Sequence, residues 1–315
     1  MPHLSIVSPV YNAEKILPYL VERIVKSVKE ITDDFEIILV EDCGPDNSWS
    51  VIESLAKENG HIIGIKFSRN FGQHYAITAG LDQAKGEWVV VMDCDLQDQP
   101  EEIVKLYKKA QEGFDIVLAR RSVRKDRFFK KFFSAMFYRT LAYLTGSNLD
   151  ETVANFGIYN RKVIVAVNQM RESIRYFPTM IKWIGFHSTT VDVQHDYRNE
   201  GKSSYSFNKL LRLALDIILA YSDKPIRLVI KFGLIVSAFS FTLAIIMLFR
   251  WVRGDISVMG YTSLIISIWF LSGIIISTLG MVGLYVGKTF EGVKKRPIYL
   301  IEKKTKNDST LPSGL

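Results

Sequence analysis

The sequence predicts an α/β domain with a parallel β-sheet covered by helices on both faces, followed by two membrane-spanning helices. Between residues 1 and 120, short runs of strand formers alternate with amphipathic helical segments, which is typical of a sheet with parallel strands. Further along, residues 232–249 and 256–287 contain no charged side chain. Because a helix needs about 20 apolar residues to cross a bilayer, each run predicts one membrane span.

The predicted strands and helices of the first part follow one another closely along the chain. Strands are expected at residues 4–10, 35–40, 62–67, 88–92 and 115–119. Helices are expected at residues 16–28, 48–57 and 73–84. In sheets of this kind the ligand lies beyond the carboxyl ends of the strands. Because Tyr11, Asp42 and Asp93 each follow a predicted strand, we expect them at one edge of the sheet.

The composition excludes several classes of protein. Hydrophobic residues make up 48% of the chain and charged residues 23%, which excludes a disordered or collagen-like chain. Two cysteines are too few for a disulfide framework, and they do not form the Cys-x-x-Cys pair of a zinc site. The net charge of +7 leaves nucleic acid, anionic lipid and phosphate-rich substrates open until the charges are placed.

Two segments combine cations with apolar side chains. Residues 120–133 interleave basic residues with four phenylalanines, a mixture that suits either nucleic acid or a membrane surface. Because two predicted spans lie in the same chain, the membrane surface is favoured and nucleic acid is not expected as a partner. Residues 207–220 are also amphipathic, and they either lie on the membrane or pack on the domain.

Charged residues around the spans predict their orientation. The larger positive charge lies outside the pair of spans rather than in their short connection, which places both ends of the chain in the cytoplasm. We therefore expect a cytoplasmic domain over residues 1–222 and a cytoplasmic polar tail over residues 291–315. The membrane region between them, residues 223–290, is expected to contain two spans at about 229–251 and 260–287. The outer basic residues are Lys224, Arg227, Lys231, Lys288, Lys294, Lys295 and Arg296.

The strongest chemical signal is the pair of acids Asp93 and Asp95 directly after an uncharged strand. Mg²⁺ and Mn²⁺ prefer oxygen ligands and commonly bridge carboxylates to the phosphates of a substrate. Gln97 adds a carbonyl oxygen that is able to bind the metal or a metal-bound water. The sequence therefore predicts an Mg²⁺ or Mn²⁺ site with Asp93, Asp95 and Gln97 at the end of this strand.

An ordered series of motifs resembles the inverting GT-A glycosyltransferases, and within them the group that acts on polyprenyl phosphates. That group includes dolichol-phosphate mannose synthases, undecaprenyl-phosphate glucosyltransferases and the aminoarabinose undecaprenyl-phosphate transferase. The resemblance covers residues 4–210, and the two predicted spans suit the bacterial members. The motifs are Ser-Pro-Val-Tyr-Asn at 8–12, Val-Glu-Asp-Cys-Gly at 40–44, Ser-Arg-Asn-Phe-Gly at 68–72 and Asp-Cys-Asp-Leu-Gln-Asp at 93–98.

The resemblance implies roles for residues around the nucleotide. Pro9, Tyr11 and Asp42 would line the base and ribose, while Asp93 and Asp95 would hold the metal on the diphosphate. Relatives usually carry an acid two positions after the tyrosine. This chain has Ala13 at that position and Glu14 at the next, so Glu14 is the candidate for the contact.

The resemblance also implies cationic contacts to phosphate. Arg121 matches the arginine after the fifth strand, with the adjacent Arg120 as its rival. Lys130 and Ser134 lie four residues apart on one predicted helix face and resemble an Arg/Ser pair offered to the phosphate of the lipid acceptor. Lysine is a point charge without the fork of arginine, so this contact would be less directional.

A further segment resembles the R-x-x-G-x-S-K-Y loop that closes over the donor. Arg198, Gly201 and Ser203 match this pattern. The lysine of the motif is replaced by Ser204, and Lys202 two residues earlier is the candidate to substitute for it.

One departure from the family bears on the mechanism. Relatives often carry Gly-Asp-Phe-Arg where this chain has Ala154-Asn155-Phe156-Gly157, and Asn155 is unable to accept the proton that the aspartate would take. A phosphate monoester has its second pKa near ~6, so a phosphate acceptor is already an anionic nucleophile at neutral pH. We therefore expect Asn155 to act as a hydrogen-bond donor. We expect the metal to offset the charge of the leaving diphosphate, and cations to hold the two anions near one another.

Taken with the resemblance, the sequence predicts a membrane-bound transferase that moves a sugar from a nucleoside diphosphate, with uridine favoured, to a polyisoprenyl phosphate such as undecaprenyl phosphate. The product would be a lipid-linked sugar for cell-surface glycans. One alternative is a transferase of the same fold with another lipid or a glycan acceptor. Another is a membrane scaffold that binds nucleotide sugar without turnover or assembles with a flippase. A homo-oligomer is also open.

Overall fold

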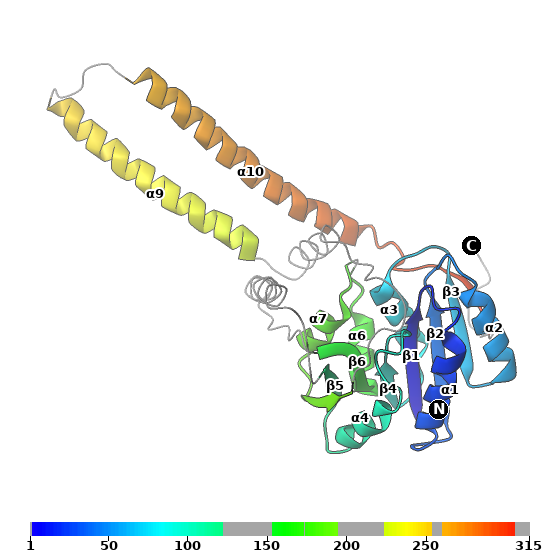
Figure 1. Ribbon diagram of the computed structural model, residues 1–315. Helices are drawn as coiled ribbons and strands as arrows, with labels where there is room; N and C mark the ends of the chain where they lie inside the picture. The colour runs from blue at the N-terminus through cyan, green and yellow to red at the C-terminus, as the bar shows by residue number, and fades with distance from the viewer. Residues whose placement is uncertain (1, 122–152, 173, 195–223, 254–259, 306–315) are drawn as a thin grey trace. The chain divides into compact units, whose positions relative to one another are not determined.

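The computed structural model describes residues 2–121, 153–172, 174–194, 224–253 and 260–305 (Figure 1). These residues fall into two compact units. The first unit contains the described residues up to 194 and those from Pro297 onward, and the second contains the long helices between them. The N-terminal unit is therefore completed by a segment from the far end of the chain, where the sequence predicts a polar tail.

A mixed β-sheet forms the centre of the first unit. Within the described residues its strands lie in the order β7-β5-β6-β4-β1-β2-β3-β8. Strands β1 to β5, which the sequence predicts, all run in the same direction, while β6 and β8 run antiparallel to their neighbours. The strands are β1 (Leu4–Val10), β2 (Phe35–Glu41), β3 (Ile62–Phe67), β4 (Trp88–Val91), β5 (Ile116–Arg121), β6 (Val153–Asn160), β7 (Ser188–Val193) and β8 (Ile301–Lys304).

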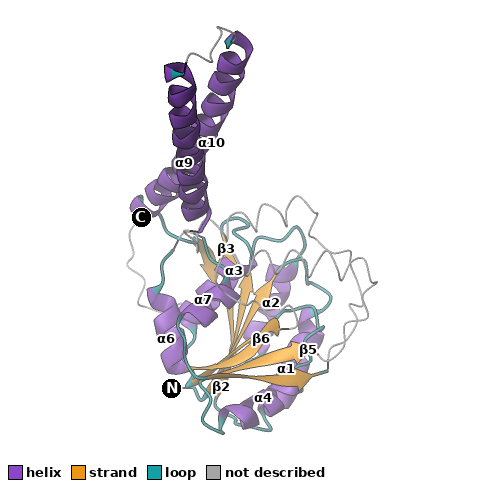
Figure 2. Cartoon of the chain, turned by 90° about the vertical axis from the view of Figure 1, so that its left-hand side faces the viewer, coloured by secondary structure: helices purple, strands orange, loops and turns teal. Residues whose placement is uncertain are grey.

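Helices cover both faces of this sheet (Figure 2). One core lies between the sheet and α1 (Leu17–Val28), α2 (Ser48–Glu58) and α4 (Glu102–Ala110). The other core lies between the sheet and α3 (Gln73–Gln83), α6 (Arg161–Gln169) and α7 (Phe177–Trp183). Alternate residues of strands β1 to β6 enter opposite cores, as the period of two along a strand requires.

Helix α3 lies unusually close to strand β1. A Cβ atom added at Gly80 would lie 2.3 Å from Cγ1 of Val7, so the sheet allows no larger residue at this position without a shift. The neighbouring Ala76 and Ala79 are also small and buried. This close packing sets the position of the first turn of α3, which lies at the carboxyl edge of the sheet.

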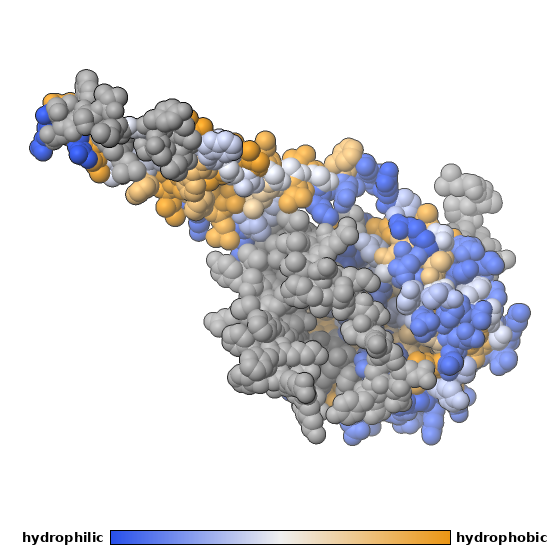
Figure 3. Space-filling model, turned by 45° about the horizontal axis from the view of Figure 1, so that its top comes forward, coloured by the Kyte–Doolittle hydropathy of each residue, from blue (hydrophilic) through white to orange (hydrophobic). Residues whose placement is uncertain are grey.

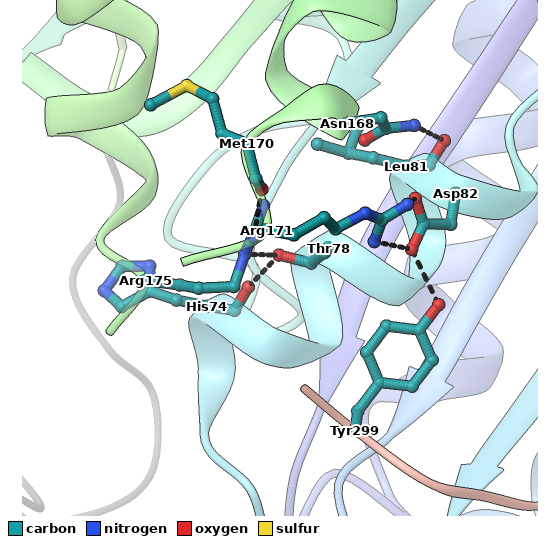
Figure 4. A network of polar contacts seen from close by, with 9 residues as sticks. All are labelled: His74, Thr78, Leu81, Asp82, Asn168, Met170, Arg171, Arg175 and Tyr299. Atoms are coloured by element: carbon teal, nitrogen blue, oxygen red, sulfur yellow. Dashed lines mark hydrogen bonds and ion pairs between the residues drawn. The ribbon is translucent and has the colours of Figure 1, made fainter. Parts of the chain in front are cut away.

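The segment after the second long helix packs on α3 and β3. Strand β8 pairs antiparallel with β3, and the ring of Tyr299 stacks on Phe67 with 5.3 Å between ring centroids. The Tyr299 hydroxyl donates a hydrogen bond to Asp82 Oδ2 at 2.7 Å, and Arg171 donates two more to the same carboxylate (Figure 4). Burial, and then the adjacent Asp82, raise the pKa of Tyr299, so its hydroxyl stays protonated and keeps donating.

The second unit contains the long helices α9 (Lys224–Val252) and α10 (Tyr261–Val293). Lys224–Thr242 and Ser267–Val293 have the length and hydropathy of membrane spans. Apolar side chains face outward along the described parts of both helices (Figure 3). Because that surface would be costly in water, the two helices indicate membrane association.

Replacing Gly80 by alanine is predicted to destabilise the first unit. Over-packing a core costs about 1–3 kcal/mol, which outweighs the ~1 kcal/mol that alanine gains over glycine inside a helix. Thermal unfolding of the full chain in detergent, followed by near-UV circular dichroism, should show a lower Tm for Gly80→Ala. In a Val7→Ala background the same change should be neutral or stabilising, because the clashing methyl group is gone. An equal loss in both backgrounds would contradict the interpretation.

Candidate active site at the carboxyl edge of the sheet

Each of three neighbouring strands is followed by a loop residue, other than glycine, with a left-handed backbone conformation. Asn12 follows β1, Cys43 follows β2 and Leu96 follows β4, with φ angles of 53°, 51° and 59°. Residues other than glycine adopt these left-handed angles at an energetic cost, and such strain often marks functional loops. Since β2, β1 and β4 are adjacent and parallel, the residues that follow them, including Tyr11, Asp42 and Asp93, lie at one edge, as the sequence predicts.

Asp42 lies at this edge with its side chain almost fully buried. It faces the side of the sheet covered by α3, because it lies two residues after Val40 on the same face. Its carboxylate accepts the backbone N–H of Phe71 at 2.7 Å and that of Gly72 at 2.9 Å. Burial raises the pKa of Asp42, and these two hydrogen bonds oppose the rise. Asp42 therefore holds the loop between β3 and α3 against the end of β2.

The predicted metal ligands follow β4 at the same edge. Asp93 Oδ1 accepts a hydrogen bond from Gln73 Nε2 at 2.6 Å. Asp95 Oδ1 accepts the backbone N–H of Gln97 at 3.2 Å, which turns the chain sharply after the strand. Burial raises the pKa of Cys94 to about 12, so the thiol between the two acids stays protonated near neutral pH.

This donor set fits a hard divalent cation that also binds substrate. Among the described residues no group of three or more His, Cys, Asp or Glu side chains forms a closed metal site. Two carboxylates and a nearby amide leave coordination positions for water and phosphate oxygens, which is the usual arrangement for Mg²⁺ and Mn²⁺ in phosphate chemistry. Asp93, Asp95 and Gln97 would hold such a cation.

The residues after β1 differ in their exposure. Pro9 is buried in β1 beside Val40, while the Tyr11 side chain is 50% exposed at the edge. The Glu14 carboxylate accepts the backbone N–H of Asn47 at 3.1 Å. Glu14 thereby links the loop after β1 to the loop after β2, a contact that spacing alone does not predict.

Asn155 lies in β6, and Arg120 and Arg121 lie in the neighbouring strand β5. Strand β6, which contains Asn155, runs antiparallel beside β4, and the pairing between them ends with Gly157 opposite Val91. Arg120 forms a paired contact with Asp192, with N–O distances of 2.6 and 3.1 Å. The backbone of Arg121 pairs with Val193 at the end of β5. Lys130, Ser134, Arg198 and Lys202 lie outside the described residues.

The start of α3 contributes residues to which the sequence analysis assigns no role. Gln73 contacts Asp93, and the only sequence signal is its position after the Ser-Arg-Asn-Phe-Gly motif, at the start of a helix. The neighbouring His74 packs edge-to-face on Tyr176, with 4.8 Å between ring centroids. Burial, and then the charge of Arg175, lower the pKa of His74 to about 4, so the imidazole is neutral near pH 7 and offers no charge to a phosphate.

The fold and the site together define a class of enzyme. An α/β sheet of this mixed topology, with an Asp-x-Asp pair after the strand at the centre of its carboxyl edge, is the GT-A arrangement of nucleotide-sugar transferases. Residues 5–167 match the family described as Glycosyl transferase family 2, and the chain belongs to that family. The protein is a glycosyltransferase.

Relatives match this chain over nearly its whole length. The undecaprenyl-phosphate 4-deoxy-4-formamido-L-arabinose transferase of Proteus mirabilis (strain HI4320) is 36% identical over 303 residues, which cover 95% of this chain and 93% of the relative. The uncharacterized glycosyltransferase YkcC of Bacillus subtilis (strain 168) is 35% identical over 300 residues, 95% of this chain and 93% of the relative. The similarity therefore includes the long helices as well as the sheet.

A solved structure supports the fold. Glucosyl-3-phosphoglycerate synthase from Mycobacterium tuberculosis, in complex with Mn²⁺, UDP-glucose and phosphoglyceric acid, superposes with a TM-score of 0.50 at 15% sequence identity. The match covers 70% of this chain and 78% of that chain. At this level of identity the likeness concerns the GT-A fold.

The buried His74 predicts a specific pH dependence of stability. Between pH 6.5 and about 4 the unfolded chain binds a proton at this imidazole and the folded chain does not, so stability falls as the pH falls through that range. His74→Leu should reduce the drop in Tm between pH 7 and pH 5, measured by thermal unfolding in detergent. The matched control His187→Leu, at an exposed position of the same unit, should leave the drop unchanged. An unchanged drop in His74→Leu would show that other groups cause it.

Proposed function

We propose that this protein transfers a sugar from a nucleoside diphosphate, with uridine favoured, to undecaprenyl phosphate and inverts the anomeric centre. The observation that carries the proposal is the match over 95% of the chain to a transferase named for undecaprenyl phosphate. The two long apolar helices support it, because the acceptor is a lipid and its phosphate lies at the membrane surface. We further propose that the catalytic unit and both ends of the chain face the cytoplasm, as the basic residues flanking the helices favour.

The donor would bind at the edge where β1, β2 and β4 end. Tyr11 is proposed to contact the nucleoside, which its exposed side chain supports, and Pro9 and Asp42 are proposed to line the same part of the site. Glu14 would keep the adjacent loops together through Asn47. Arg198 and Lys202 are proposed to close over the donor.

Asp93, Asp95 and Gln97 would hold Mg²⁺ or Mn²⁺ against the diphosphate. Bound there, the cation would offset the negative charge that develops on the leaving nucleoside diphosphate. Arg121 is proposed to contact the same diphosphate, since Arg120 is engaged with Asp192. Lys130 and Ser134 are proposed to hold the acceptor phosphate near it.

The chemical step requires little acid–base catalysis. An oxygen of the acceptor phosphate forms a bond to the anomeric carbon while the bond from that carbon to the diphosphate oxygen breaks, and the bonding electrons leave with the diphosphate. Since the acceptor is already anionic near neutral pH, no proton has to be removed from it. We propose that Asn155 donates a hydrogen bond to one of the two anions, which is supported by its position in β6, the antiparallel neighbour of β4.

A turnover assay tests the proposed function. Full-length protein in detergent would be given undecaprenyl phosphate, Mn²⁺ or Mg²⁺ and a panel of UDP- and GDP-sugars, and the release of UDP or GDP would be followed. We expect release with one donor that depends on the lipid, and a loss of about 100-fold or more in Asp95→Ala. Asp115→Ala, which changes an acid at the opposite edge of the sheet, should retain activity. Donor binding without any release would identify a non-catalytic protein.

Substitutions at Asn155 test whether the site uses a base. Asn155→Ala removes the hydrogen-bond donor and should lower kcat by about tenfold to 100-fold. Asn155→Asp should not raise activity, because a phosphate acceptor has no proton that needs removal near pH 7. The measurement is kcat against pH from 6 to 9 for both variants. Full activity in Asn155→Ala would remove this residue from the mechanism.

A further inference from the structure

Gln73, the first residue of α3, contacts one of the two acids of the proposed metal site. Its side-chain amide donates a short hydrogen bond to Asp93 Oδ1, with 2.6 Å between the two atoms. A hydrogen bond to Oδ1 restricts the rotation of the Asp93 carboxylate about the Cβ–Cγ bond. The direction in which Asp93 presents its oxygens therefore depends on where Gln73 lies.

The backbone around Gln73 is held independently of that amide. The preceding Gly72 has a φ of 109°, a conformation that favours glycine, and its carbonyl accepts the N–H groups of Tyr75 and Ala76. Asp42 binds the N–H groups of Phe71 and Gly72. Removing the Gln73 amide therefore leaves the loop fixed at Asp42, so the contact with Asp93 does more than anchor the loop.

The rest of α3 is fixed as well. Gly80 lies against Val7 of β1. Thr78 accepts a hydrogen bond from Arg175 Nε at 2.7 Å, and Asp82 is held by Arg171 and Tyr299 (Figure 4). Since the helix is held along its length, its first residue has little freedom to follow a movement of Asp93.

We propose that Gln73 is a positioning residue of the metal site, which sets the orientation of the Asp93 carboxylate before the cation and the nucleoside diphosphate bind. The inference rests on the proposed role of Asp93 as a metal ligand. Groups that hydrogen-bond a ligating side chain typically change metal affinity by about 10- to 100-fold. Gln73 would act through Asp93 without contacting the reacting atoms.

Gln73→Met tests this role, because methionine keeps the length of the side chain and favours a helix but lacks the amide donor. Gln83→Met is the matched control, with the same substitution at the other end of α3, where Gln83 contacts Lys304. Free Mn²⁺ would be measured by electron paramagnetic resonance during titration of the full-length protein in detergent with saturating UDP. We expect Mn²⁺ affinity to fall about tenfold or more in Gln73→Met and less than about twofold in the control.

Two further measurements separate positioning from a structural role. UDP binding without metal, followed by calorimetry, should be the same in Gln73→Met and the wild type. Turnover should need more Mn²⁺ for half-maximal rate and recover most of its kcat at saturating Mn²⁺. Unchanged Mn²⁺ affinity, or an equal loss of UDP binding with and without metal, would overturn the proposal.

The outcome is separable from that of the proposed function. Wild-type protein that binds Mn²⁺ with UDP in a Gln73-dependent way but releases no UDP with undecaprenyl phosphate would support the positioning role and refute the proposed acceptor. Wild-type protein that binds no Mn²⁺ in the presence of UDP would overturn the positioning role, because Asp93 would then have no metal to hold.

Discussion

The close contact between helix α3 and the sheet is the constraint on which the candidate site depends. Gly80 brings the helix against Val7, and the helix axis then carries its first turn to the edge where β1, β2 and β4 end. Asp42 and Asp93 both face that side of the sheet, since each lies two residues after a strand residue packed against α3. The loop before α3 therefore donates a backbone hydrogen bond to Asp42. Gln73, the first residue of α3, donates a side-chain hydrogen bond to Asp93.

In the described part of the site, backbone and side-chain amide N–H groups donate hydrogen bonds to these acids. Asp42 accepts two backbone N–H groups, while Asp93 and Asp95 each accept at least one hydrogen bond from an uncharged donor. These donors restrict the orientation of each carboxylate. Oriented carboxylates suit a site whose proposed ligand is a divalent cation.

The segment after α10 ties the far end of the chain to the catalytic unit. Strand β8 extends the sheet beside β3, and Tyr299 reaches Asp82 near the end of α3. Tyr299, which follows α10, is thus hydrogen-bonded to α3. The first residue of α3 contacts Asp93. Hydrogen bonds to the partly buried Asp82 carboxylate from both Tyr299 and Arg171 make this attachment specific.

Local patterns in the sequence determined the strands β1 to β5, helices α1 to α3, the two long apolar helices and the Asp93–Asp95 pair. They do so because a period of two, a period of 3.6 and a long uncharged run each reflect the immediate surroundings of a segment. The tertiary structure alone decided that β6 and β8 run antiparallel, that His74 is buried and neutral, and that Gln73 contacts Asp93. These features join residues far apart in the chain, as with Asp82 and Tyr299, and no local periodicity encodes which distant partner a polar side chain meets.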